Sequence, residues 1–381
     1  MLNSIHFCAI INIIILWTNH ALIVSPFKSG GSYMKYIDMH CDTIFEIHQQ
    51  KCGLRENNLH IDLNKLKEAN TLVQNFALFV PLHERDEKNN DITPADKNPL
   101  KDVLTLADVY YRELEANKDL IAPAFTYGDI EKNTKDGKLS ALLTVEEGGV
   151  CLGDLSVLRM LHRLGVRMMT LTWNFPNEIG FPNVDLSKIR PDTEAMASKN
   201  VPPASLNKAD TVNGLTETGI AFVEEMNRLG MIVDVSHLSD AGFYDVLKYS
   251  RKPFVASHSN ARSVCGAARN LTDDMIKSLA NAGGVTGLNF CANFLTDPIP
   301  GKENPGTMEA VAAHAKHIVN VGGMECLGLG SDFDGIATNQ GVPDASHIPK
   351  LFDLLKKNGF SESDLEKICY KNVLRVYKEN F

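Results

Sequence analysis

Apolar runs of strand length end repeatedly in a histidine, an aspartate or a glutamate along this chain. Five runs do so: Tyr36–Asp42 with His40 and Asp42, Ala141–Glu146, Met231–His237, Phe254–His258 and Cys326–Asp332. The runs alternate with amphipathic segments of helix length, which predicts a parallel sheet. Metal ligands and catalytic acids at the carboxyl ends of parallel strands are typical of a (β/α)8 TIM-type barrel. The sequence therefore predicts a barrel hydrolase with a two-metal site.

Eight strands and their helices account for nearly all of the chain after Met34. The other three strands are expected at Leu72–Val80, Val166–Thr172 and Gly284–Asn289. Helices are expected near Asp102–Ala116, at Leu155–Leu164 before Gly165, at Thr216–Leu229 before Gly230, after a Thr272 cap, and after a capping box in Ser363–Glu366. Segment 173–213 is rich in Pro, Asn, Asp and Ser, and we expect it to shape the substrate pocket.

The composition narrows the class of protein. A formal net charge of −9 without any basic run argues against a nucleic-acid partner. The eight cysteines include no CxxC pair, and several lie in apolar patterns, as reduced core cysteines do. These observations favour a soluble protein of a reducing compartment.

Residues 1–33 stand apart from the predicted catalytic domain, residues 34–381. The run Phe7–Val24 is long enough for a membrane span and resembles the apolar part of a signal peptide, yet no Lys or Arg precedes it. Because the first strand begins two residues after Met34, we expect Met34 to be the natural start and the protein to be cytoplasmic. Export or anchoring through residues 7–24 is the alternative.

The histidines at strand ends suit metal ions. His40 and Asp42 are two residues apart, so on a strand they share one face and can bind one side of a Zn²⁺. The alternative for Asp42 is a cap of the next helix. His237 and His258 end neighbouring strands, and although a lone buried histidine is usually a core residue, two at the same edge point to a second metal.

Glu146 and Glu147 are adjacent acids, so only one of them can face the barrel axis. A carboxylate between two cations can bridge them at a spacing of about 3.5–4 Å. A solvated loop acid is the plainer interpretation, and it is the one we favour for Glu147.

Two further residues carry candidate roles. Asp332, the first acid past its strand, can pass a proton from a metal-bound water to a leaving amine, while Asp334 is expected to cap the turn. Arg269 follows the His258 strand, where its guanidinium can grip a carboxylate, although an arginine in such a loop is usually a surface residue.

Six motifs in order resemble the membrane dipeptidase (renal dipeptidase-like) zinc metallopeptidases, from about Tyr36 to the C-terminus. They are Asp38–Asp42, Val145–Gly149, Asp234–His237, Ser257–Ser259, Ala268–Asn270 and Gly330–Gly335. The resemblance implies a barrel with two zinc ions and hydrolysis of dipeptides by a hydroxide that bridges the zinc ions. It assigns His40 and Asp42 to one zinc, His237 and His258 to the other, Glu146 as the bridge, Asp332 as the proton shuttle and Arg269 as the anchor of the dipeptide's C-terminal carboxylate.

The chain departs from the family pattern in two places. Leu171-Thr172-Trp173-Asn174 stands where mammalian relatives have Leu-Thr-His-Asn, and that histidine would contact the scissile carbonyl. The family's tyrosine after the seventh strand is missing from Asn289–Phe294. The resemblance thus leaves the preferred substrate open, while the retained ligands predict that hydrolysis survives.

Two other functions remain open from the sequence. One is a metal-dependent amidohydrolase of the same fold acting on a cyclic amide or a nucleobase, although many of these carry His-x-His where this chain has His-x-Asp. The other is a non-catalytic, degenerate barrel with Trp173 as a sign of lost function, against which the full ligand set argues. The sequence does not distinguish a monomer from a homodimer.

Overall fold

The computed structural model describes residues 33–85, 91–92, 98–188, 208–299 and 302–381. The predictions for residues 1–32, including Phe7–Val24, and for part of the insertion, residues 189–207, lie outside the described residues. Residues Met34–Phe381 form one compact unit. Among the helices that are described, none combines the length and the apolar character needed to cross a membrane.

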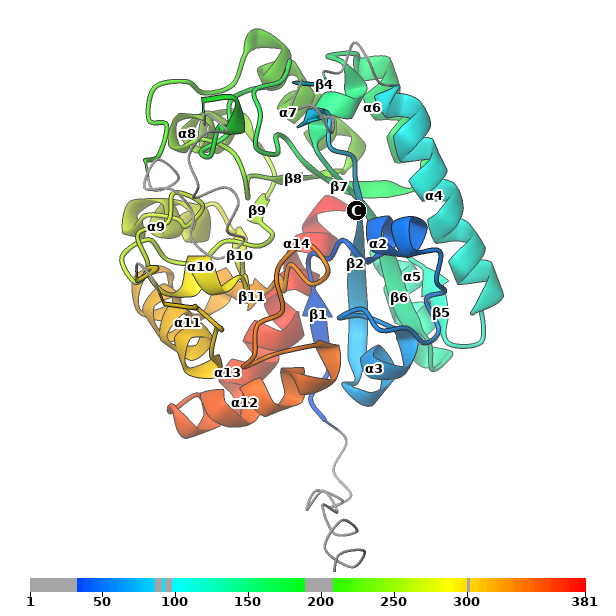
Figure 1. Ribbon diagram of the computed structural model, residues 1–381, viewed down its shortest axis with the longest axis vertical. Coiled ribbons are helices and arrows are strands. Elements are labelled where there is room, and N and C mark those ends of the chain that lie inside the picture. Colours follow the sequence, from blue (N-terminus) through cyan, green and yellow to red (C-terminus); the bar gives the residue numbers. More distant parts are fainter. Residues whose placement is uncertain (1–32, 86–90, 93–97, 189–207, 300–301) are drawn as a thin grey trace, which may run out of the picture. The chain divides into compact units, whose positions relative to one another are not determined.

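A closed parallel barrel forms the centre of this unit, which confirms the predicted fold (Figure 1). Within the described residues one sheet has nine strands, and the pairing of β2 (Thr71–Phe79) with β6 (Leu139–Glu146) closes eight of them into the barrel. In barrel order the strands are β1 (Tyr36–Asp38), β2 (Thr71–Phe79), β6 (Leu139–Glu146), β7 (Val166–Thr170), β8 (Ile232–Asp234), β9 (Val255–Ala256), β10 (Val285–Leu288) and β11 (Leu327–Leu329). The ninth strand, β5 (Ile121–Pro123), pairs with the start of β6, and β3 (Glu84–Arg85) and β4 (Asp91–Ile92) form a separate hairpin.

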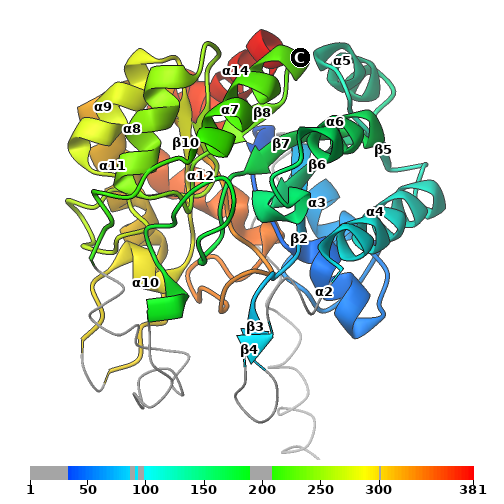
Figure 2. The ribbon, with the colours of Figure 1, turned by 90° about the horizontal axis from the view of Figure 1, so that it is seen from above.

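Helices surround the strands, as Figures 1 and 2 both show. They are α2 (Thr43–Gln50), α3 (Leu63–Glu68), α4 (Pro99–Ala116), α5 (Tyr127–Lys135), α6 (Leu155–Leu164), α7 (Glu217–Leu229), α8 (Asp240–Tyr249), α9 (Asp273–Asn281), α10 (Ala292–Leu295), α11 (Met308–Gly322), α12 (Ile348–Lys357), α13 (Glu362–Glu366) and α14 (Asn372–Asn380). Short 3-10 helices cover Gly148–Cys151, Leu186–Lys188, Met324–Cys326 and Ala345–His347, and a π-helical segment, Lys367–Lys371, joins α13 to α14.

Most of the predicted helix ends are confirmed. Gly165 and Gly230 end α6 and α7 with φ angles of 118° and 79°, which a residue without a Cβ adopts at little cost. Thr272 caps α9 through its side chain. The capping box near the C-terminus was placed two residues too late, because Ser361 and Asp364 form it and α13 begins at Glu362.

The two ends of the barrel differ in character. Apolar side chains from the strands, Ile37, Val73, Leu142, Met168, Ile232, Val255 and Val285, form one buried cluster with Val373, Val376 and Tyr377 of α14. In Figure 2, α14 lies at the end of the barrel opposite the β3–β4 hairpin and α10. The hairpin follows the carboxyl end of β2, and α10 follows the carboxyl end of β10. The end of the barrel opposite α14 is therefore the one where the strands end and where the predicted metal ligands are expected.

Candidate metal centre

The five predicted metal ligands lie together at the carboxyl ends of the strands. His40, Asp42, Glu146, His237 and His258 are all buried, with exposed fractions between 0% and 7%. Only Glu146 belongs to a strand, because β1, β8 and β9 end two to three residues before the histidines that follow them. The strands predicted to include these histidines are therefore shorter than expected, and the ligands lie on the loops just beyond them.

Glu146 has one carboxylate oxygen on each side of the centre. Its Oε2 lies 3.2 Å from His40 Nε2, which is also 3.5 Å from Asp42 Oδ2. Its Oε1 lies 2.9 Å from His237 Nε2 and 3.8 Å from His258 Nε2. The five residues thus form two ligand groups that share Glu146, which is the arrangement a bridging carboxylate requires.

Hydrogen bonds on the far side of two rings determine which nitrogen is free for a metal. Ser257 Oγ donates to Asp234 Oδ2 at 2.6 Å and so accepts from His258 Nδ1 at 2.7 Å. Asn174 Oδ1 accepts from His237 Nδ1 at 3.0 Å. Both histidines therefore present a lone pair on Nε2 toward the centre, as ligating histidines do.

Several candidate ligand atoms at the centre make no hydrogen bond within the described part of the chain. Both ring nitrogens of His40 and Oδ1 of Asp42 are buried without a hydrogen bond. Buried polar atoms of this kind are costly unless another group satisfies them. Three imidazoles with two carboxylates match the ligand types that Zn²⁺ prefers, so these residues fit a pair of zinc ions.

Burial shapes the charges of the centre. It raises the pKa of Glu146 to about 8, and the neighbouring Asp42 adds to the shift. It lowers the pKa of His237 and of His258 well below the usual value, which favours the neutral, ligating form. For His40, burial lowers the pKa, but the carboxylates of Glu146 and Asp42 outweigh this and raise it well above the usual value. Cations at the centre would favour the deprotonated form of these carboxyl groups and so lower their pKa.

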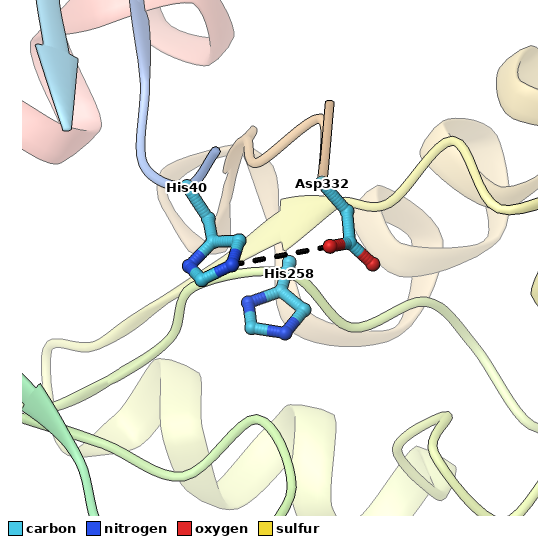
Figure 3. Close-up of side chains that lie close together, drawn as sticks. All are labelled: His40, His258 and Asp332. Carbon is cyan, nitrogen blue, oxygen red and sulfur yellow. Dashed lines mark ion pairs between the residues drawn. The ribbon is translucent and has the colours of Figure 1, made fainter. Parts of the chain in front are cut away.

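Asp332 lies beside the centre on a left-handed turn, with a φ of 62°. Its Oδ1 is 3.9 Å from His40 Nε2, and its Oδ2 accepts a hydrogen bond from Asn289 Nδ2 at 2.8 Å. Figure 3 shows the side chains of Asp332, His40 and His258 close together, with the ion pair between Asp332 and His40 dashed. The rings of His40 and His258 are stacked, with 4.0 Å between their centroids. Burial raises the pKa of Asp332 to about 6.

Arg269 is buried, with an exposed fraction of 4%, so the interpretation as a surface arginine is wrong. Its Nη1 donates to Ser259 Oγ at 3.3 Å, and its guanidinium lies 5.5 Å from the centroid of the Phe294 ring. Its Nε and Nη2 have no hydrogen-bond partner among the described residues. A buried guanidinium with two free donors can bind a carboxylate bidentately.

Glu147 is also buried, at 1% exposed, and the prediction of a solvated loop acid is wrong. Its φ of 89° turns its side chain away from that of Glu146. It accepts hydrogen bonds from Gly149 N at 2.8 Å, Asn177 Nδ2 at 2.6 Å and Trp173 N at 3.1 Å. Burial raises its pKa to about 7. Glu147 therefore fastens the segment after β7 to the end of β6.

Among the hydrogen bonds of the described residues, those of the Asp334 side chain go to other segments and not to its own turn, so the expectation of a turn cap is wrong. Asp334 accepts hydrogen bonds from Thr43 Oγ1 at 2.5 Å and from His60 N at 2.7 Å. Asp42, at the N-cap position of α2, makes no side-chain capping bond, so the capping alternative for that residue is wrong. Asp334 thus ties the loop after β11 to the first turn of α2.

Two supporting acids were missed by the sequence analysis, although both lie in the quoted motifs. Asp38 and Asp234 are the last residues of β1 and β8, and both are fully buried. Asp38 accepts hydrogen bonds from Ser331 N and Oγ at 2.8 and 2.6 Å, while Asp234 accepts from Ser257 N and Oγ. An acid within an apolar run, two or three residues before a ligand, is the signal that would have identified them.

Comparisons with known proteins identify the family of the chain. The profile described as membrane dipeptidase (peptidase family M19) matches residues 31–380. Dipeptidase verJ of Clonostachys rogersoniana is 33% identical over 319 residues, which cover 83% of this chain and 75% of that protein. An uncharacterized dipeptidase of Schizosaccharomyces pombe is 32% identical over 366 residues, which cover 93% of this chain and 82% of that protein.

Two solved structures share the fold over nearly their whole length. A structure described as the dipeptidase AC, an M19 metallopeptidase, has a TM-score of 0.76 and 27% identity, covering 92% of this chain and 99% of its own. A metallopeptidase from Rhodobacter sphaeroides, solved with a phosphinate mimic of L-Ala-D-Ala, has a TM-score of 0.76 and 25% identity, covering 92% and 100%. With a profile match over nearly all of its length, the chain belongs to the membrane dipeptidase family, peptidase family M19.

Proposed function

We propose that this protein is a metal-dependent dipeptidase that holds two zinc ions. The observation that carries the proposal is the position of the Glu146 carboxylate between two groups of buried donors. His40 and Asp42 would hold one ion, His237 and His258 the other, and Glu146 both. When bound, zinc supplies Lewis acidity that lowers the pKa of a water to about 7 and polarises a carbonyl.

Arg269 would position the substrate. Its two unpartnered N–H donors suit the C-terminal carboxylate of a dipeptide, and its burial strengthens that ion pair. A longer peptide presents an amide at this position and would leave the buried guanidinium without an anion. The geometry therefore supports a peptidase whose substrate ends one residue after the scissile bond.

Asp332 would move the proton. As a carboxylate it takes a proton from the attacking water, whose oxygen forms a bond to the carbonyl carbon. The same proton then goes to the amine nitrogen when the C–N bond breaks. Asn289 holds the Asp332 carboxylate at 2.8 Å, which orients Oδ1 toward the centre.

A panel of dipeptides tests the function. The full chain, loaded with zinc, is assayed against dipeptides with L- and D- second residues, because a relative was solved with a mimic of L-Ala-D-Ala. We expect free dipeptides to be cleaved, a chelator to abolish turnover and zinc to restore it. Amidated dipeptides serve as the matched control and should be poor substrates. Turnover that survives chelation, or cleavage of cyclic amides or nucleobases instead of dipeptides, would overturn the proposal.

A further inference from the structure

Three aromatic side chains form a row in which Trp173 contacts the other two, and we name them the aromatic wall: Phe79, Trp173 and Phe175. Phe79 and Trp173 meet edge to face at 5.0 Å between ring centroids, and Trp173 lies 6.1 Å from Phe175. All three are half-buried, so part of each ring remains accessible. Such rings offer a large apolar contact area with little conformational freedom to lose.

The wall adjoins the ligands directly. The Trp173 ring centroid is 6.5 Å from that of His237, and Phe79 is the β2 partner of Glu146 in the parallel ladder. The ring of His83 stacks on Phe175 at 4.5 Å between centroids, so a titratable side chain adjoins the wall at Phe175, whereas His237, Phe79 and Phe175 are the ring neighbours given for Trp173. A substrate group that lies against His237 and Glu146 would therefore meet aromatic rings.

The backbone around Trp173 is held in place on both sides. The backbone N–H of Trp173 donates to Glu147 Oε2 at 3.1 Å. The side-chain oxygen of the next residue, Asn174, accepts from His237 Nδ1 at 3.0 Å. Asn177 Nδ2 donates to both Glu147 Oε1 and Leu171 O. The backbone that carries the indole is thus fixed to Glu147, next to the ligand Glu146, and through Asn174 to the ligand His237.

Arg269 approaches the centre from a different part of the barrel. It follows β9 and packs on Phe294 of α10, whereas the wall comes from the ends of β2 and β7. The strand order places β8 between β7 and β9. If Arg269 binds the C-terminal carboxylate, the residue on the amino side of the scissile bond extends toward the wall.

We propose that the aromatic wall binds the side chain of the dipeptide's N-terminal residue and selects aromatic and large apolar side chains over acidic ones. This inference rests on the proposed dipeptidase function and deepens it by naming the substrate class. The physical reason is that ring contacts and apolar burial stabilise a phenyl or isobutyl group, while a carboxylate that lies against the rings of Trp173 and Phe79 would lose hydration. Trp173 is the specificity-determining residue of this subsite.

The test uses the full, zinc-loaded chain and two substrate series. In one series the first residue varies, with Phe, Leu, Ala and Asp before a constant Ala, and in the other the second residue varies after a constant Ala. We expect kcat/KM for Phe-Ala to exceed that for Asp-Ala at least about tenfold, the scale of one buried aromatic contact. Trp173→Ala should remove most of this preference, Trp173→Phe should retain part of it, and the exposed-residue control Met160→Ala should behave as the wild type.

Fluorescence supplies a reading that does not depend on turnover. The chain has two tryptophans, Trp17 and Trp173, so a Trp17→Phe protein reports on Trp173 alone. A phosphinate mimic of Phe-Ala should change its emission saturably, with half-saturation at the inhibition constant, and a mimic of Asp-Ala should require a higher concentration.

The outcomes separate this inference from the function on which it rests. If the wild type cleaves no dipeptide, both fall. If it cleaves dipeptides but Trp173→Ala leaves the first-residue preference unchanged, or shifts the second-residue series instead, only the aromatic wall is overturned. Unchanged Trp173 emission at a concentration of the Phe-Ala mimic that inhibits the enzyme would overturn it as well, even if Trp173→Ala fails to fold.

Discussion

The Nε2 atoms of His237 and His258 face each other at 3.1 Å, and each carries a lone pair. Two lone pairs at this distance repel. Neither Nε2 can donate to the other, because each neutral ring carries its one proton on Nδ1, where it is hydrogen-bonded to Asn174 or to Ser257. A cation that both nitrogens coordinate removes the repulsion. Folding therefore brings the two Nε2 atoms to positions that a bound cation would stabilise.

Replacing His237 by Ala should remove about one of two zinc ions per chain, because one ligand group then keeps only His258 and the shared Glu146. The measurement is metal content after dialysis, with circular dichroism to verify the fold. A His237→Ala protein that keeps both ions and full activity would show that this residue is no ligand.

Ser257→Ala should lower zinc affinity by about 10- to 100-fold, the usual effect of losing an outer hydrogen bond to a ligating histidine. The variant removes the hydroxyl that links His258 Nδ1 to Asp234. Competition with a chelator of known affinity measures the change. Ser263→Ala, on the exposed part of the following loop, is the matched control, and equal affinities of the two variants would contradict the prediction.

Asp332→Asn should keep both metals and the fold but lose about 10²- to 10⁴-fold in kcat, because an amide cannot carry the proton. The amide retains the size of the side chain and an oxygen that can accept from Asn289. Metal analysis and steady-state kinetics are compared on one preparation. Loss of zinc in place of turnover would instead make Asp332 a ligand.

Arg269→Lys should raise KM more than it lowers kcat, because a lysine keeps the charge but not the planar pair of donors. The effect should vanish for amidated dipeptides, which offer no carboxylate. Kinetics on both substrate forms measures the difference. Equal losses on free and amidated substrates would assign Arg269 another role.

His314 should make stability depend on pH. Its Nδ1 accepts from Ala261 N and its Nε2 donates to Leu295 O, so the folded chain holds the ring neutral, and burial lowers its pKa to about 4. The unfolded value is about 6.5, so between these values the unfolded chain binds a proton that the folded chain does not. The free energy of unfolding should therefore fall by about 3 kcal/mol as the pH is lowered from about 7 to about 4.

Chemical denaturation of wild type and His314→Gln over this pH range measures that contribution. A glutamine side chain offers an acceptor oxygen and a donor amide group and does not titrate. The unfolding free energy of the His314→Gln protein should therefore fall less steeply with decreasing pH than that of the wild type. His317→Gln removes a half-buried histidine from the same helix and serves as the control. A wild type and a His314→Gln protein with the same pH dependence would contradict the assignment.

The sequence by itself determined the barrel and the positions of the candidate ligands along the chain. Alternating apolar runs and amphipathic segments, with Gly165 ending one helix, are local patterns, and the parallel barrel follows from their order. Because parallel strands bring their carboxyl ends to one rim, polar residues such as Glu146 and His258 could be expected to lie near one another before any contact was known.

Only the tertiary structure decided which polar groups are buried and what they contact. Glu147 turns away from the axis through a positive φ, and Arg269 lies between the Phe294 ring, which follows it in the sequence, and Ser259, which precedes it. The hydroxyl of Ser331 reaches Asp38 across 293 positions of sequence. Periodicity reports which face of an element is apolar, whereas burial and hydrogen-bond partners depend on residues far apart in the chain, which only the closed barrel brings together.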